Sequence, residues 1–130
     1  MRSAFTLIEL VFVIAIVGIL AAFAMPQYMA TAENAEAVKC KTFVGTLNRT
    51  VSHSLWSDAF FHDRSNLETS ITEEKIKEQI KVPETCGTAE KYADAVNGTP
   101  FVIHIGGNDY NVTGTPPDSS SPAQWIWAKQ

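Results

Sequence analysis

The chain lacks most of the features that mark an enzyme or a nucleic-acid-binding protein. Its 10 lysines and arginines are outnumbered by 14 acidic residues, which gives a formal net charge of −4 and a pI near 5.3. This balance argues against a broad basic surface for nucleic acid. The sequence shows no nucleophile paired with a base and no phosphate-binding loop. We therefore expect neither an enzyme nor a cofactor-binding protein.

Cysteine is also scarce, with only Cys40 and Cys86. Two thiols without matching histidines make a poor zinc site. In an oxidising compartment an even pair favours a disulfide, and two unpaired thiols are the alternative. A bond between Cys40 and Cys86 would close a loop of about 47 residues, which the chain-entropy model values at about 4 kcal/mol.

Residues of metal-ligating type occur without a recognisable spacing. The first group is His53, Asp58, His62 and Asp63, and the second is Asn108, Asp109 and Asp118. Neither group reproduces a zinc or calcium pattern, so we expect no metal site. Asn-x-Thr tripeptides begin at Asn48, Asn97 and Asn111. Such tripeptides are common by chance, and they leave glycosylation open.

The chain does have a long apolar run, from Phe5 to Met25, which contains a single charged residue, Glu9. Roughly 20 helical residues cover a hydrocarbon core of about 30 Å, so the run is long enough to span a bilayer. A carboxylate inside such a run costs about 2.5–3.5 kcal/mol near the helix centre. We therefore expect Glu9 to have a function and a positively charged partner.

A secretory signal peptide is the alternative interpretation of this run. The run is longer than a usual apolar signal region, and Ala24 is followed by Met25 and Pro26, where cleavage is unfavourable. The start amine and Arg2 favour a cytoplasmic N-terminus with the rest of the chain outside. We therefore favour a membrane anchor.

A short polar leader, residues 1–4, precedes the apolar run. The residues that follow in a recognisable order are Phe5, Thr6, Leu7, Ile8, Glu9, Gly18 and Pro26. This arrangement resembles the class III signal of type IV pilins and type II secretion pseudopilins, over roughly the first 30 residues. The resemblance implies that a prepilin peptidase cuts between Ala4 and Phe5 and that the new Phe5 amine is N-methylated. The family usually has glycine before the cut, where this chain has Ala4.

Cleavage would give Glu9 its partner, because it creates a positive amine at Phe5, one helical turn away. Glu9 also lies in the first turn, where the helix dipole favours a carboxylate. The resemblance implies that Glu9 also meets the Phe5 amine of a neighbouring subunit, which makes it a register device for assembly. The alternative is an acid that only caps the helix at the membrane interface.

Gly18 and Pro26 are expected to shape the same helix. Proline removes a backbone donor and clashes with the preceding turn, so Pro26 should bend the helix. The alternative is that glycine and proline are simply commoner in membrane helices.

Beyond Pro26 the helix is predicted to continue to about Trp56. Its apolar face consists of Cys40, Val44, Leu47, Val51 and Leu55, at helical spacing. The segment from Asp58 to Arg64 is expected to end the helix. Ser70 and Glu73 have capping-box spacing and predict a short helix over residues 72–81, with Glu73 and Lys77 paired.

The C-terminal part changes to the period of a β-sheet. Residues 101–105 and 110–113, separated by residues 106–109, predict a hairpin, and residues 124–128 a third strand. His104 is expected to be an exposed strand residue. The fold class is therefore α+β, with a long N-terminal helix, membrane-spanning in its first half, packed against an antiparallel sheet of about three strands. The resemblance implies the same type IV pilin-like shape.

These observations divide the chain into a leader (1–4), a transmembrane and assembly helix (5–26) and a periplasmic or extracellular globular domain (27–130). The resemblance implies a structural prepilin that polymerises into a type IV pilus or a type II secretion pseudopilus. Its implied partners are pilin subunits, the prepilin peptidase/N-methyltransferase and an inner-membrane assembly platform. The alternative is a membrane-anchored periplasmic binding module or enzyme that does not polymerise. Pilus or pseudopilus, major or minor subunit, and an adhesion or DNA-uptake role all stay open.

Overall fold

The computed structural model describes residues 5–62, 67 and 70–130. The leader with Ala4, together with Asp63 and Arg64, lies outside the described residues. Contacts divide the chain into two units, Met1–Ala35 and Glu36–Gln130. Each unit is considered by itself below.

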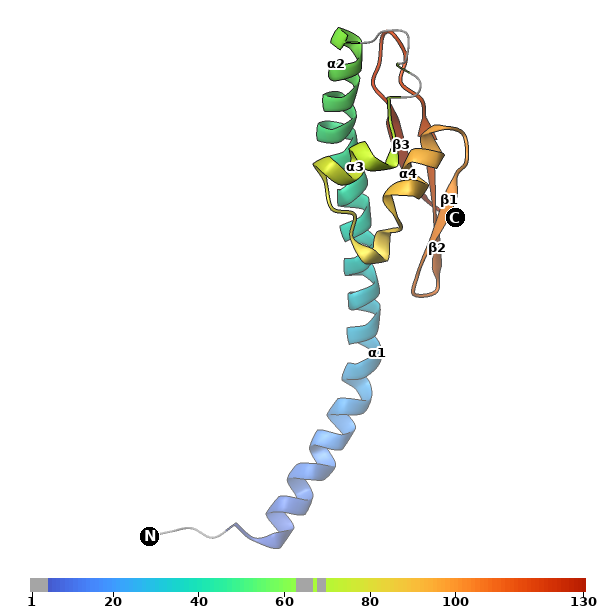
Figure 1. Ribbon diagram of the computed structural model, residues 1–130. Helices are drawn as coiled ribbons and strands as arrows, with labels where there is room; N and C mark the ends of the chain where they lie inside the picture. Colours follow the sequence, from blue (N-terminus) through green and yellow to red (C-terminus); the bar gives the residue numbers. More distant parts are fainter. Residues whose placement is uncertain (1–4, 63–66, 68–69) are drawn as a thin grey trace. The chain divides into compact units, whose positions relative to one another are not determined.

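A continuous helical run opens the described chain (Figure 1). It consists of α1 (Leu7–Thr46), the single π-helical turn η1 (Leu47–Val51) and α2 (Ser52–His62). The predicted end near Trp56 was wrong, since the helix runs on to His62. No glycine or proline interrupts residues 52–62, and the Trp56 and Phe60 rings stack at 5.1 Å on successive turns.

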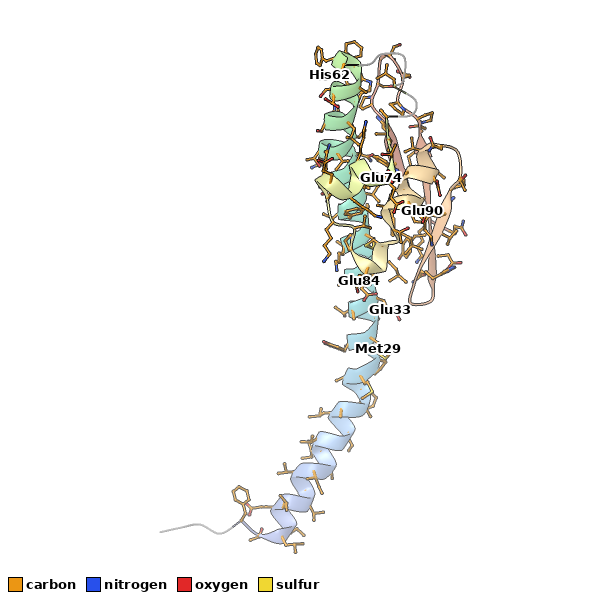
Figure 2. The ribbon with its side chains drawn as sticks, in the orientation of Figure 1. Met29, Glu33, His62, Glu74, Glu84 and Glu90 are labelled. Atoms are coloured by element: carbon orange, nitrogen blue, oxygen red, sulfur yellow. A yellow bond between two sulfur atoms is a disulfide. The ribbon has the colours of Figure 1, made fainter. Side chains whose placement is uncertain are left out.

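The N-terminal unit is the first part of α1, which passes through Gly18 and Pro26 without a break in its assignment. Its apolar side chains are exposed all round, as the sticks up to Met29 show (Figure 2). Among the described residues, one helical run is long and apolar enough to cross a membrane by length and composition. The bend at Gly18 and Pro26 stays a prediction.

In the second unit, the helix buries the apolar face that its sequence predicts. The buried positions include Cys40, Val44, Leu47, Val51 and Leu55. They share one hydrophobic core with Ile76, Tyr92, Val112 and Trp125 from the other elements of the unit. The prediction that this face packs on a globular head is confirmed.

The sheet has the predicted three antiparallel strands, β1 (Phe101–Ile105), β2 (Asn108–Thr115) and β3 (Gln124–Lys129), in the order β1-β2-β3. The hairpin turn is tighter than expected, because Asn108 already pairs with Ile105. Only Gly106 and Gly107 are left between the strands, and Gly106 takes a φ of +59°, which glycine adopts without strain. His104 is exposed, as predicted, and lies opposite Asp109.

The short helix between the long helix and the sheet is α3 (Glu73–Gln79), within the predicted range. Its cap differs from the prediction, since the Thr72 side chain accepts from the Lys75 N–H. Ser70 is buried instead, with no hydrogen-bond partner for its hydroxyl among the described residues. The predicted ion pair between Glu73 and Lys77 is present, and the hydrogen bond to Glu73 raises the pKa of Lys77.

The helix α4 (Ala89–Val96), which follows the 3-10 turn η3 (Glu84–Cys86), was not predicted from the sequence. The signal was present, because Ala89, Tyr92, Ala93 and Val96 have helical spacing and all are buried. Thr88 caps the helix by accepting from the Lys91 N–H at 3.4 Å. α4 lies directly on β2 at Gly114, where an added Cβ would come within 2.6 Å of the Val96 nitrogen.

Asn48 attaches the long helix to the edge strand β3. Its side-chain amide donates to the Trp125 carbonyl at 2.8 Å, and its carbonyl accepts from the Trp125 N–H at 2.8 Å. The amide thus occupies the place of a neighbouring strand and satisfies both backbone groups. One turn along, the buried Ser52 hydroxyl donates to the Ala123 carbonyl. Because its amide is engaged in this way, Asn48 is a poor acceptor for a glycan.

Replacing Asn48 with leucine is expected to destabilise the globular unit by roughly 2–4 kcal/mol, since it leaves two backbone groups of Trp125 without partners. Asn48→Asp keeps the acceptor for the Trp125 N–H, but it places a carboxylate oxygen against the Trp125 carbonyl in place of the donor. We therefore expect it to destabilise the unit by a similar amount. Urea unfolding of the full chain in detergent, followed by tryptophan fluorescence, measures both. An Asn48→Leu variant as stable as the wild type would contradict this account of the helix–sheet contact.

Candidate assembly site at the start of the long helix

Thr6 and Glu9 form a reciprocal hydrogen-bonded cap at the start of α1. The Thr6 N–H donates to Glu9 Oε2 at 3.1 Å, and the Thr6 hydroxyl donates to the same oxygen at 2.9 Å. The Glu9 N–H in turn reaches Thr6 Oγ1 at 3.4 Å. This is a capping box, in which the two side chains satisfy backbone donors that the first turn leaves free. The sequence placed Glu9 in the first turn and Thr6 in the motif, but the cap between them was not predicted, although the Thr-x-x-Glu spacing was readable.

The cap leaves part of the Glu9 carboxylate available. Both bonds from Thr6 end on Oε2, and the described residues give Oε1 no hydrogen bond. The described part of the chain also shows no ion pair to Glu9. The neighbouring side chains are strongly exposed and apolar, with Phe5 at 82%, Leu7 at 80% and Ile8 at 76%. The site can therefore accept a cation on one carboxylate oxygen while the other holds the helix start.

The structure describes all of the predicted cleavage and bending residues except Ala4. Ala4 lies outside the described residues, while Phe5 is described and precedes the first helical turn. A Cβ added at Gly18 would meet no atom within 4 Å. In the isolated chain Gly18 is therefore not required by a close contact, and the structure brings neither Gly18 nor Pro26 near Glu9 along the helix.

The two cysteines form a disulfide between Cys40 on α1 and Cys86 in η3. Both are fully buried, and their sequence separation is 46 residues. The alternative of two unpaired thiols is therefore excluded. The ring of Tyr92 packs against that of Phe43, and its hydroxyl donates to the Cys86 carbonyl at 2.9 Å. Burial raises the pKa of Tyr92 above its ordinary value, which is already well above neutral pH.

The candidate metal ligands are engaged in local contacts. His62 pairs with Asp58 at 3.1 Å on α2, and His104 contacts Asp109 across the hairpin. Asp118 Oδ1 accepts from the Ser120 hydroxyl and from the N–H groups of Ser120 and Ser121, and these hydrogen bonds lower the pKa of Asp118 to about 2. The described residues contain no group of three or more His, Cys, Asp or Glu arranged to hold a metal ion.

Comparison with known proteins identifies the front of the chain. Residues 1–25 match the family model of the prokaryotic N-terminal methylation motif. This motif is the class III prepilin signal of type IV pilins and pseudopilins. No solved structure matches the chain. The match ends within α1, before the first residue of the globular unit, and it includes both residues of the Thr6–Glu9 cap.

Proposed function

We propose that this chain is a structural prepilin, processed between Ala4 and Phe5 and assembled through α1 into a pilus or pseudopilus. The methylation motif supports a pilin-like or pseudopilin-like prepilin, and the exposed apolar part of α1 is consistent with membrane anchoring. The observation that carries the proposal is the carboxylate of Glu9. It lies at the start of an apolar helix, and the described residues leave one of its oxygens without a hydrogen bond, so that this oxygen can accept a cation.

The proposed cation is the Phe5 amine, first of the same chain and then of a neighbouring subunit. Two opposite charges at about 4 Å attract by about 4 kcal/mol at an effective dielectric of 20, which offsets much of the cost of burying them. An unpaired Glu9 would be penalised in an apolar helix bundle. Subunits would therefore stack where the charges meet.

The proposed partners follow from this role. They are further pilin subunits, the prepilin peptidase/N-methyltransferase that acts on the leader, and an inner-membrane assembly platform. Before assembly the chain would cross the inner membrane once, with its N-terminus in the cytoplasm. Afterwards the globular unit would form the surface of a periplasmic or cell-surface filament.

A membrane-anchored enzyme or binding module would need a cleft with converging polar groups. The described chain has an open pocket of about 660 Å³ between α3 and α4. Its described lining comprises Lys77, Ile80, Lys81, Val82, Glu84, Gly87, Thr88 and Ala89. This lining includes no nucleophile paired with a base, and so it does not favour the alternative over a structural subunit.

The mature chain is expected to begin at Phe5, with one added methyl group on the Phe5 amine. Intact-mass measurement on the membrane and filament fractions checks this, with a strain that lacks the prepilin peptidase as the control. Ala4→Gly, which restores the residue usual in the family, should be cleaved at least as fast. A mature chain that begins after Ala24 would instead support a secretory signal peptide and overturn the proposal.

A further inference from the structure

The helix carries three exposed charges just beyond its membrane-spanning part, at Glu36, Lys39 and Lys41. Within the described residues, none of the three takes part in an ion pair. Glu36 and Lys41 are five residues apart, so they lie about 140° apart around the helix and cannot face each other in one chain. These charges are therefore available to another molecule.

Lys41 also lines an open groove along the helix surface. The groove has a volume of about 370 Å³ and is lined by Lys41, Thr42, Gly45, Thr46 and Arg49. A Cβ added at Gly45 would meet no atom within 4 Å, so the groove floor is bare backbone. Both charged residues of the groove are basic. Its chemistry therefore fits an acidic side chain that approaches from outside.

A second copy of the chain supplies such a side chain at the correct height. If subunits stack so that the Phe5 amine of one copy meets Glu9 of the next, the first copy is shifted outward by four residues, about 6 Å. The same shift brings its Glu36 level with position 40 of the neighbour, between Lys39 and Lys41. Copies in a regular filament repeat by one constant shift, so where α1 runs parallel in two copies the four-residue shift at Phe5 is also a four-residue shift at Glu36.

We propose that Glu36 of one subunit pairs with Lys41 of its neighbour in the assembled filament. This pairing rests on the proposed function. It would be a second contact that fixes the shift between subunits, on the globular unit, in addition to the contact at Glu9. An inward shift by four residues would instead bring Glu36 level with Ala32, next to the like-charged Glu33. Only the outward shift that pairs Phe5 with Glu9 also pairs these charges.

The two faces also suit an open-ended polymer. Glu36 and Lys41 lie on different sides of the helix, so each subunit can present Glu36 to one neighbour and Lys41 to the other. Such a heterologous contact can repeat without closing on itself, as a filament requires. The choice of Lys41 over Lys39 follows from this, since Lys39 is only three residues from Glu36 and shares its side of the helix.

Charge reversal of the full chain in its native host tests the pair. Glu36→Lys and Lys41→Glu should each lower the yield of sheared surface filaments about tenfold, the equivalent of 1.4 kcal/mol per association step. The double swap should restore the yield to within about twofold of the wild type, because the two changes are coupled. Glu78→Lys and Lys129→Glu, exposed charges elsewhere on the globular unit, are the matched controls and should assemble normally.

The outcomes separate this pair from the underlying function. Single reversals that assemble as well as the wild type, or a double swap no better than either single, would overturn the pair and leave the structural-subunit proposal standing. A processed wild-type chain that forms no filament would overturn the proposed function itself. Carbodiimide cross-linking of filaments mixed from light and heavy-nitrogen subunits gives a check that needs no variant. It should yield a mixed-label Glu36–Lys41 peptide, and a Glu36–Lys39 peptide in its place would overturn the choice of Lys41.

Discussion

Replacing Glu9 with glutamine is expected to abolish filament assembly while the chain is still processed to begin at Phe5. The glutamine side chain keeps an oxygen at the same place and can still complete the capping box with Thr6. It loses the negative charge, which leaves the neighbour's Phe5 amine unpaired in an apolar bundle. Breaking a buried pair in this way costs about 3–5 kcal/mol, or more than a hundredfold in each association step.

The capping box supplies the matched control for this prediction. Thr6→Ala removes the cap and keeps the charge, so it should cost about 0.5–2 kcal/mol of helix stability and leave filaments present. Filament yield after shearing, together with the intact mass of the membrane-bound pool, distinguishes the two variants. Normal filaments from Glu9→Gln, or their loss only in Thr6→Ala, would show that Glu9 acts as a helix cap and not as an assembly charge.

Removing the disulfide should have the second large effect, on the stability of the globular unit. Its cysteines are 46 residues apart, and the chain-entropy model gives about 4 kcal/mol for a loop of this length. Single domains are stable by only about 5–15 kcal/mol, so the bond supplies a large share of the total. A Cys40→Ala, Cys86→Ala variant should therefore unfold at a much lower urea concentration.

Urea titration of the full chain in detergent, read by tryptophan fluorescence, measures this loss. The reduced wild type is the matched control, because it keeps both sulfur atoms in the core and lacks only the bond. Similar losses in the two samples would assign the effect to the cross-link. If the free energy of unfolding falls by less than about 1 kcal/mol in both samples, the value from the chain-entropy model is contradicted. The stability of the unit would then come mainly from core packing.

Local patterns in the sequence were sufficient for much of the fold. The 3.6-residue spacing of Cys40, Val44 and Leu47 predicts the buried face of the helix, and the alternation in residues 101–105 predicts β1. Both depend on neighbours along the chain, which explains why they could be read without a structure. With only two cysteines, the identity of the disulfide partners also followed from the sequence, once an oxidising compartment was assumed.

The errors occurred where a local signal competed with tertiary packing. Ser70 has capping-box spacing, yet it is buried and Thr72 caps α3 instead. The helix runs past Trp56 because nothing in residues 57–62 stops it, although the mixture of charged and aromatic residues suggested a loop. The helix α4 was overlooked although its apolar residues recur at helical spacing, because eight residues make little more than two turns of periodic pattern.

The sequence by itself determined the methylation motif, the apolar run that is long enough to cross a membrane and the lone acid Glu9, because all three are contiguous in the chain. Only the tertiary structure decided which residues fasten the helix to the sheet. Asn48 meets Trp125 across a separation of 77 residues, and Gly114 admits the backbone of α4. Neither contact can be predicted from a local sequence pattern, because each joins two segments that are far apart in the chain. For Glu9, the structure added the hydrogen-bonded cap with Thr6. The role of Glu9 in setting the register of an assembly is a proposal that the Glu9→Gln and Thr6→Ala variants test.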